Sequence, residues 1–236
     1  FSDEMSDAGK TFTGLWKETF SPGKTGTQNY LLYTAATTGA FFFDEQVRGV
    51  AKANQSELAD MLFSTDAFYG EGYTYIPLLA LYGYGIAANN RDIRNLGLKL
   101  TAGSTFALFY NMSLKTLIGR SRPFLNQGNA SFNPFSFAFE NTSFPSGHTT
   151  FTFAIAAVVD HETNSLPLEA LFYSAAVWTA MARIYHDVHW FSDTVAGAAI
   201  GYFAARWAAR ELDRLQNNRQ LQNAPSAPII HITIPL

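Results

Sequence analysis

Long apolar runs separated by short polar stretches dominate this chain and predict helices rather than strands. Residues 29–43 predict a buried helix, although their β-branched side chains lower its helix propensity. Residues 44–68 place apolar side chains at helical spacing between charges, which predicts one or two amphipathic helices on the outside of a bundle. Residues 72–90 are 19 uncharged residues, enough to cross a bilayer, but their tyrosines, glycines and asparagines equally fit a central helix of a water-soluble bundle.

The second half of the chain predicts longer helices, over residues 91–119, 146–159, 167–183 and 190–217. The last of these carries many glycine and alanine residues, which allow close contact with a neighbouring helix. Because these periodic segments all have helical spacing, the expected fold is an all-α bundle of about seven helices.

We divide the chain into a surface arm over residues 1–27, a helical domain over residues 28–217 and a tail over residues 218–236. Three apolar residues are expected to anchor the arm on the domain: Phe12, Leu15 and Trp16. Within the tail, residues 224–236 alternate weakly between apolar and polar residues and predict a β-like segment laid on the body or on a partner, in which His231 is structural.

The composition lies between those of soluble and membrane proteins, because 47% of the residues are hydrophobic, 15% are charged and the mean hydropathy is near zero. With a net charge of −3 and no basic patch in the sequence, we expect no nucleic-acid partner. The chain has no cysteine, which excludes disulfides and thiolate metal sites.

The chain begins with Phe1 rather than methionine, and we expect a signal peptide to have been removed before this residue. Polar residues also interrupt every charge-free run. The sequence therefore predicts a periplasmic or otherwise non-cytoplasmic protein that is soluble or loosely associated with a membrane, with an integral membrane protein as the alternative. Peripheral membrane contact is part of this prediction.

A turn formed by Pro145, Ser146, Gly147 and His148 leads directly into an apolar helix. Proline presets the backbone for a helix start, serine can cap the helix, and glycine lets a ligand approach the backbone. Several amide groups can therefore point at one oxyanion, with His148 beside it as a proton donor. Phosphate is the expected anion, although the same four residues are also ordinary turn residues before a helix.

Two further segments supply positive charge to such a site. Lys115 and Arg122 lie seven residues apart on one face at the end of a predicted helix, which a proline stops. Downstream, Arg183 adds a third cation. His189 is followed four residues later by Asp193, whose carboxylate can orient the imidazole.

In order and spacing, these three segments resemble the type 2 phosphatidic acid phosphatase family, which also includes bacterial class A non-specific acid phosphatases and vanadium haloperoxidases. The family pattern reads K-x6-R-P, then P-S-G-H, then S-R-x5-H-x3-D. The chain matches every position except one, where Ala182 replaces the family serine. One neutral hydrogen bond is worth about 0.5 to 1.5 kcal/mol, so this difference affects positioning and not the expected reaction class.

The resemblance implies an all-α phosphatase in which helix ends bring the three motifs to one rim and no metal is required. It implies that His189 is the nucleophile that forms a phosphohistidine, that Asp193 fixes its tautomer, and that His148 is the general acid. The phosphate-binding residues that it implies are Lys115, Arg122, Ser146, Gly147 and Arg183. Phosphate ester cleavage requires positive charge around the equatorial oxygens, an in-line nucleophile and an acid for the leaving oxygen.

The nucleophilic imidazole must be neutral and the general acid must be protonated at the same pH. Asp193 raises the pKa of His189 while the three cations lower it, and the sequence leaves the direction of the balance open.

Three functions stay open at the level of sequence. The first is a phosphatase of phosphate monoesters or lipid phosphates, whose partner is a phosphorylated small molecule or lipid. The second is a vanadium haloperoxidase, because vanadate mimics the five-coordinate phosphoryl transition state; vanadate is then a prosthetic group, and otherwise an inhibitor. The third is a non-catalytic binder of phosphate or lipid, which the two histidines and Asp193 disfavour.

The connection over residues 124–144 joins the first two motifs and holds six phenylalanines. It predicts an apolar wall or lid beside the phosphate pocket, and the alternative is that the rings anchor the loop on the protein's own helices. Outside the motif positions, His161 is expected to face solvent at a helix C-terminus, and His186 and Asp187 are expected to lie at the pocket edge.

Overall fold

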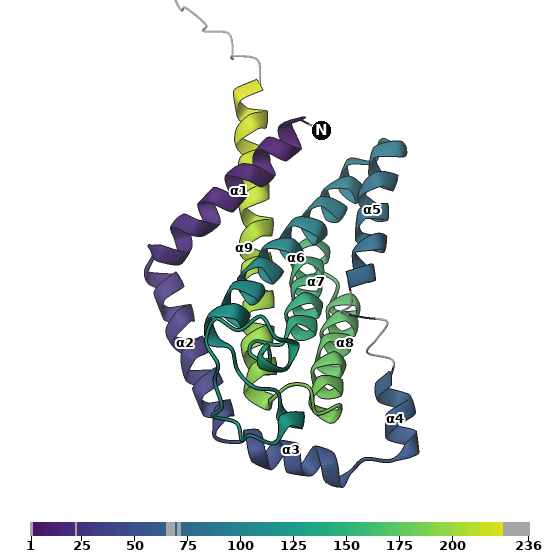
Figure 1. Cartoon of the computed structure of the whole chain (residues 1–236). Helices are drawn as coiled ribbons and strands as arrows, with labels where there is room; N and C mark the ends of the chain where they lie inside the picture. Colours follow the sequence, from purple (N-terminus) through teal and green to yellow (C-terminus); the bar gives the residue numbers. More distant parts are fainter. Residues whose placement is uncertain (1, 22, 65–68, 70–71, 224–236) are drawn as a thin grey trace, which may run out of the picture.

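The structure of the protein is a computed structural model that describes residues 2–21, 23–64, 69 and 72–223. Within these residues the chain forms nine α-helices and no β-strand, as Figure 1 shows. The predicted all-α fold is therefore confirmed, and the number of helices is close to the predicted seven.

Four helices belong to the N-terminal part: α1 (Ser2–Phe20), α2 (Lys24–Phe41), α3 (Asp44–Ala53) and α4 (Glu57–Phe63). Five longer helices follow: α5 (Tyr75–Ala87), α6 (Arg91–Ile118), α7 (Gly147–Thr163), α8 (Leu166–Tyr185) and α9 (Phe191–Asn223). Three short 3₁₀ turns lie between these helices, one before α5 and two between α6 and α7: η2 (Gly72–Thr74), η3 (Pro123–Leu125) and η4 (Phe139–Asn141).

Helix α7 forms the centre of the bundle, where it packs against α6, α8 and α9 (Figure 1). Its side chains supply most of the apolar core, including Phe151, Ala154, Ile155, Ala157 and Val158. Since three helices enclose α7, the first turn of this helix has a fixed position relative to the ends of its neighbours.

Helix α9 approaches α7 closely because its contact face carries small residues. A Cβ atom at Gly197 would lie 2.6 Å from the carbonyl oxygen of Ser146, and a Cβ atom at Gly201 would overlap the carbonyl oxygen of Thr150. The close helix contact predicted from the small residues is confirmed. This contact holds the start of α9, which carries Asp193, beside the start of α7.

Helix α2 lies on the outside of the bundle against α9, so the prediction that this segment is buried is wrong. The Tyr33 hydroxyl donates a hydrogen bond to the Ala199 carbonyl at 3.0 Å, and the Tyr33 ring packs on Phe203. On the opposite side, Leu31 is 67% exposed and Leu32 is 65% exposed. A helix that is apolar on all sides does not reveal from its sequence which faces are covered.

Helices α3 and α4 match the amphipathic segment that was predicted on the outside, and Val50, Leu58 and Met61 are exposed there. Helix α5 packs against α6 but is not a central helix, since Ile76 and Leu79 are exposed on its outer face. Among the described residues, none of the helices has both the length and the apolar character needed to span a membrane.

The segment expected to be a surface arm is helical, and Phe12 of α1 packs against Phe106 and Phe109 of α6, as predicted for an anchor. The side chains of Leu15 and Trp16 lie outside the described residues. Helix α9 continues to Asn223, past the predicted end at residue 217. Residues 224–236, with His231, also lie outside the described part of the chain.

Candidate active site

The first motif follows the end of α6. Gly119 ends this helix with a φ angle of 62°, and a Cβ atom there would overlap the carbonyl oxygen of Asn133. Glycine at this position therefore allows the chain to turn sharply after α6 and to pass close to the backbone of Asn133. Lys115, in the last turn of α6, is buried, and its Nζ atom donates to the Thr142 carbonyl at 2.6 Å.

Arg122 lies beside Lys115, because its Nη2 atom reaches the same Thr142 carbonyl at 3.5 Å. Its Nε atom donates to the Phe139 carbonyl at 2.9 Å, and its Nη1 atom donates to the Val188 carbonyl at 3.2 Å. Since Val188 precedes the second histidine of the motifs, Arg122 connects the first motif to the third.

The second motif begins α7. Ser146 occupies the N-cap position, as expected, but its side chain makes no capping hydrogen bond. Its amide donates to the Asp193 carbonyl at 2.9 Å and so connects the second motif to the third. Gly147 opens the helix, and a Cβ atom there would lie 3.7 Å from Lys115 Cε. His148 follows in the same turn and is partly exposed.

The third motif joins α8 to α9. Arg183 lies in the last turn of α8, His189 is buried in the connection, and Asp193 is fully buried in the first turn of α9. The His189 Nδ1 atom lies 3.6 Å from Asp193 Oδ2, which is longer than a hydrogen bond. The structure thus brings the predicted pair together, and hydrogen bonds in sites without substrate are often long.

The environment lowers the pKa of three basic groups of the site, His189, Lys115 and Arg122. Burial is the main cause that holds the pKa of His189 well below its ordinary value, followed by the charges of Lys115, Arg122 and Arg183 and by His148. The balance that the sequence left open therefore favours a neutral imidazole at His189. Because each of these groups acts electrostatically on His189, the three motifs meet at one place.

Burial also lowers the pKa of Lys115 to about 7, with a further contribution from the charge of Arg122. The pKa of Arg122 falls to about 10, again through burial first and then through the charge of Arg183. Like charges that crowd one another in a buried place are stabilised by an anion placed between them. The site therefore has the electrostatics of an anion-binding pocket.

Residues outside the predicted set hold Asp193. Its Oδ1 atom accepts from Arg120 at 2.6 Å, and its Oδ2 atom accepts from the Ser143 hydroxyl at 2.5 Å and the Trp190 amide at 2.9 Å. The side chain of Asn111 donates to the Pro145 carbonyl at 3.2 Å and so supports the second motif. No sequence pattern marks Ser143 or Asn111, because single polar residues in an apolar helix or loop are common.

Three further residues lie in or beside the third motif: Ala182, His186 and Asp187. Asp187, expected at the pocket edge, accepts hydrogen bonds from Arg48 at 2.6 and 2.8 Å and forms an ion pair with Lys52 at 3.1 Å. His186 is exposed at the end of α8. Ala182, where the family has serine, is fully buried in the turn that carries Arg183.

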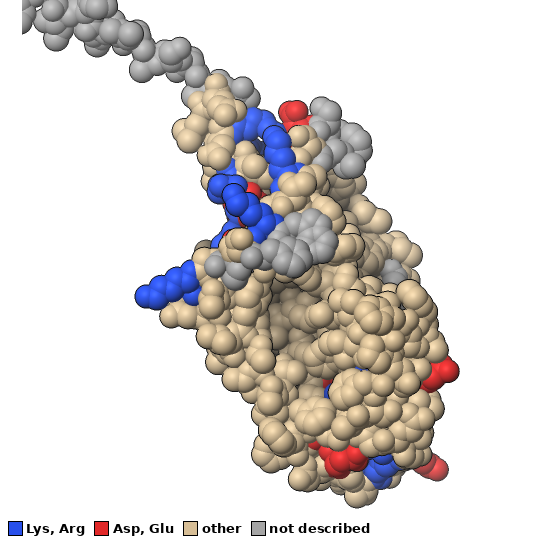
Figure 2. Space-filling model, turned by 60° about the vertical axis from the view of Figure 1, so that its left-hand side comes forward, with Lys and Arg blue, Asp and Glu red and all other residues tan. Residues whose placement is uncertain are grey.

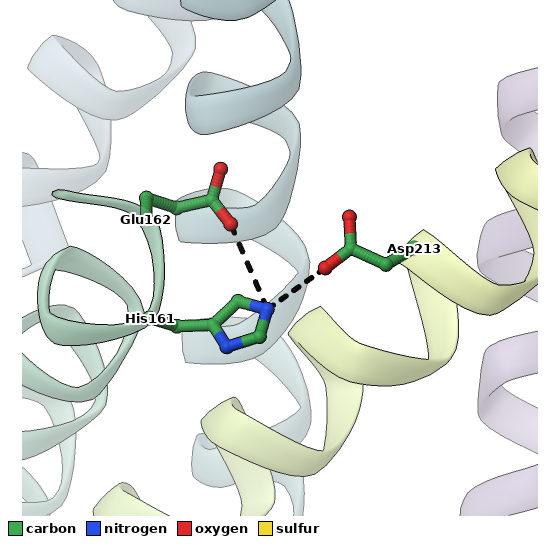
Figure 3. A group of neighbouring side chains, drawn as sticks. All are labelled: His161, Glu162 and Asp213. Carbon is green, nitrogen blue, oxygen red and sulfur yellow. Dashed lines mark hydrogen bonds and ion pairs between the residues drawn. The ribbon is translucent and has the colours of Figure 1, made fainter. Parts of the chain in front are cut away.

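His161 is not the solvent-facing residue that was expected. It points from the end of α7 toward Asp213 of α9, with its Nε2 atom 2.8 Å from the carboxylate, and Glu162 lies beside it (Figure 3). Each of the three side chains offers an atom of the kind that binds metals. However, Lys99 Nζ lies 2.6 Å from Glu162 and 2.5 Å from Asp213, so these groups form an ion-pair network.

The family model of the PAP2 superfamily matches residues 96–216, which include every motif residue described above. The chain belongs to the PAP2 superfamily. The match begins in α6 and ends in α9, and helices α1 to α5 lie outside it.

Two curated relatives illustrate this membership. A lipid A 1-phosphatase from Rhizobium etli is 40% identical over 91 residues, which cover 37% of this chain and 38% of the relative. A protein from Escherichia coli, named as a candidate undecaprenyl-diphosphatase, is 34% identical over 132 residues, which cover 54% of this chain and 62% of the relative. The chain therefore aligns with less than two thirds of the length of either relative.

Two solved structures have the same fold. The crystal structure of Aquifex aeolicus LpxE is 25% identical with a TM-score of 0.56, over 71% of this chain and 95% of that chain. A transmembrane PAP2-type phosphatidylglycerolphosphate phosphatase from Bacillus subtilis is 19% identical with a TM-score of 0.61, over 80% of this chain and 95% of that chain.

Proposed function

We propose that this PAP2 protein is a phosphatase that removes a terminal phosphate group from a lipid phosphate or another phosphate monoester through a phosphohistidine intermediate. One observation carries the proposal: three cationic side chains and two histidines, from three separate motifs, act on one another electrostatically at one rim of the bundle. Such a group has the positive charge, the neutral imidazole and the second imidazole that phosphoryl transfer requires.

In the first step, His189 attacks the phosphorus atom. Its Nδ1 atom faces Asp193, so its Nε2 lone pair is the one that forms the P–N bond while the P–O bond to the leaving group breaks. His148 gives its proton to the departing oxygen, which leaves as an alcohol or a phosphate. The cations Lys115, Arg122 and Arg183 stabilise the charge on the three equatorial oxygens.

In the second step, a water molecule attacks the phosphohistidine. His148, now neutral, takes a proton from this water while the new P–O bond forms and the P–N bond to His189 breaks. Inorganic phosphate leaves, and both histidines return to their starting states. No metal ion is needed in this sequence of steps, because the three cations carry the charge stabilisation.

Two observations support a lipid as the substrate. The connection between the first two motifs exposes its phenylalanine rings, with Phe135 70% exposed and Phe137 84% exposed. The alternative that these rings anchor the loop in the core is thus wrong for these two residues. The relatives are also named as phosphatases of lipid A and of undecaprenyl diphosphate. Exposed aromatic rings beside a phosphate pocket suit an apolar chain attached to the phosphate.

The proposal is tested by phosphate release from p-nitrophenyl phosphate, phosphatidic acid, phosphatidylglycerophosphate and undecaprenyl diphosphate, each with and without EDTA. We expect release that EDTA does not reduce, vanadate inhibition, and a preference for a lipid substrate. Bromide oxidation by added hydrogen peroxide in the presence of vanadate, without phosphate release, would instead support a haloperoxidase. Phosphate binding without any turnover would support a non-catalytic binder.

We further propose that the protein acts outside the cytoplasm and touches a membrane through its uncharged surface. Figure 2 shows a broad surface without charged side chains, with Lys and Arg gathered toward the upper part of the view. The test is expression with a bacterial export signal, followed by a carbonate wash of the membranes. Release by the wash agrees with loose association, and retention until detergent is added supports the integral alternative.

A further inference from the structure

Asp44, the first residue of α3, is a fully buried carboxylate at the base of the active site. Its Oδ1 atom accepts from the Ser192 amide at 2.7 Å, and its Oδ2 atom accepts from the Ser192 hydroxyl at 2.8 Å and from Arg120 at 2.6 Å. A buried charge is costly unless it is paired and hydrogen-bonded, and Asp44 is both. This residue lies outside the part of the chain that matches the PAP2 superfamily.

Arg120 lies between Asp44 and Asp193. Its Nη2 atom donates to Asp44, and its Nη1 atom donates to Asp193 Oδ1 at 2.6 Å and to the Ser192 hydroxyl at 2.8 Å. Its Nε and Nη2 atoms also donate to the Asn129 carbonyl at 2.9 and 2.7 Å. The guanidinium is fully buried, keeps its charge at all ordinary pH values and has a fixed fork geometry.

The combined charge of Asp44, Arg120 and Asp193 determines the electrostatic potential on the side of His189 that faces Asp193. Asp193 and Arg120 alone would cancel each other, and the side of His189 that faces Asp193 would then carry no net charge. With Asp44 included, the three side chains carry one net negative charge. The groups that act on His189 from the other elements are all basic: Lys115 of α6, Arg122 after α6, His148 of α7 and Arg183 of α8.

We propose that Asp44 is a positioning residue of the active site, which offsets the charge of Arg120 so that Asp193 presents a net negative charge to His189. This inference rests on the proposed role of His189 as the nucleophile. Positive charge develops on the imidazole when Nε2 bonds to phosphorus, and a net negative charge beside Nδ1 stabilises it. Through Ser192, Asp44 also fixes the first turn of α9, which carries Asp193.

The first test is Asp44→Asn, which keeps the side-chain volume and removes the charge. We expect kcat to fall by about 10- to 100-fold, the range seen when the outer partners of metal-bound histidines are replaced, with little change in KM. Loss of the negative charge disfavours the imidazolium, so the titration of the His189 ring, followed by NMR, should move to lower pH. The acid limb of kcat/KM should move in the same direction.

The matched control is Arg48→Gln. It removes one of two other ion pairs that hold α3 against the third motif, the pair between Arg48 and Asp187. It leaves the pair between Lys52 and Asp187 and the charge of Asp44 in place. We expect this variant to lower the melting temperature without moving the His189 titration. An equal movement in both variants would show that docking of α3, and not the charge of Asp44, is responsible, and would overturn the proposal.

A series of variants changes the net charge beside His189 in steps, so that the test does not depend on one substitution. The net charge of Asp44, Arg120 and Asp193 is −1 in the wild type, 0 in Asp44→Asn, −2 in Arg120→Gln and −1 in the double variant. The His189 titration should therefore lie lowest in Asp44→Asn, highest in Arg120→Gln, and at similar pH in the wild type and the double variant. If Asp44→Asn does not fold, Arg120→Gln and the double variant give the same comparison.

An unchanged His189 titration across the folded variants would overturn the inference. Failure of the proposed function gives a different result, because wild-type protein would then release no phosphate, or His189→Ala would keep its activity. The NMR titration needs no substrate, so the effect of Asp44 on His189 can be measured whether or not the protein is a phosphatase.

Discussion

Asp193 Oδ2 lies 3.6 Å from His189 Nδ1, while the same oxygen accepts hydrogen bonds from the Ser143 hydroxyl and the Trp190 amide. The carboxylate is thus held by groups other than His189. It acts on His189 as a fixed negative charge, and the imidazole can approach it when phosphate binds. This arrangement suits the neutral nucleophile that we propose at His189.

Replacement of the two histidines should produce different kinetic defects. His189→Ala removes the atom that bonds to phosphorus, so turnover should be lost for every substrate while the fold remains. His148→Ala should lower kcat by about 10²- to 10⁴-fold for esters with poor leaving groups, and by less for p-nitrophenyl phosphate, whose phenolate leaves with little protonation. The measurement is kcat for a series of phosphate esters with different leaving-group pKa values. The same dependence on leaving-group pKa in both variants would contradict these roles.

Lys115 should limit activity on the alkaline side. Its pKa is lowered to about 7, so in the free enzyme its ammonium group loses its proton as the pH rises through 7. Since kcat/KM reports the free enzyme, kcat/KM should fall above about pH 7. Lys115→Arg keeps the charge to much higher pH, so the alkaline limb should move upward even if the maximum falls. An unmoved limb would show that a group other than Lys115 sets it.

The motif residues could be predicted from the sequence because their spacing from helix ends is local. The positions of Lys115 and Arg122 could be predicted from the end of one helix. Those of His189 and Asp193 could be predicted from one turn and from the start of the helix after it. The contacts that hold them could not be predicted in this way. Asp44 and Arg120 are separated by 76 residues, and an acidic residue at a helix start is ordinary in sequence. The exposure of α2 was also missed, because an apolar run does not show which of its faces packs.

The exposed phenylalanines should affect lipid substrates selectively. Replacing Phe135 and Phe137 with Ser removes rings that lie mostly in solvent, so the melting temperature should change little. KM for a lipid phosphate should rise by about tenfold or more, the effect of losing one or two buried apolar contacts of about 1.5 to 3 kcal/mol each, while KM for a sugar phosphate stays the same. The control is the same pair of changes at Phe42 and Phe43, which are also exposed but lie outside this loop. Equal rises for both substrate types would contradict the role in lipid binding.

The contact between α7 and α9 should be sensitive to one added methyl group. In Gly201→Ala the new Cβ atom meets the Thr150 backbone, so the helices must separate, and we expect a loss of about 1–3 kcal/mol in the free energy of unfolding, with lower kcat. Gly39→Ala, in the last turn of α2, meets no atom within 4 Å and should stabilise the protein by about 0.4–1 kcal/mol. Urea unfolding of both variants checks the pair. Equal stability of the two would show that the close approach of α9 to α7 is absent.

The central claim is that His189 carries the phosphoryl group between the two steps. It is tested most directly by mixing the enzyme with ³²P-labelled substrate, quenching within the first turnover, and locating the label by peptide mapping under alkaline conditions, where phosphohistidine survives. We predict a labelled peptide that contains His189, loss of the label in acid, and no label in His189→Ala. Phosphate release from wild-type enzyme without a labelled protein, or a label that persists in His189→Ala, would contradict the account.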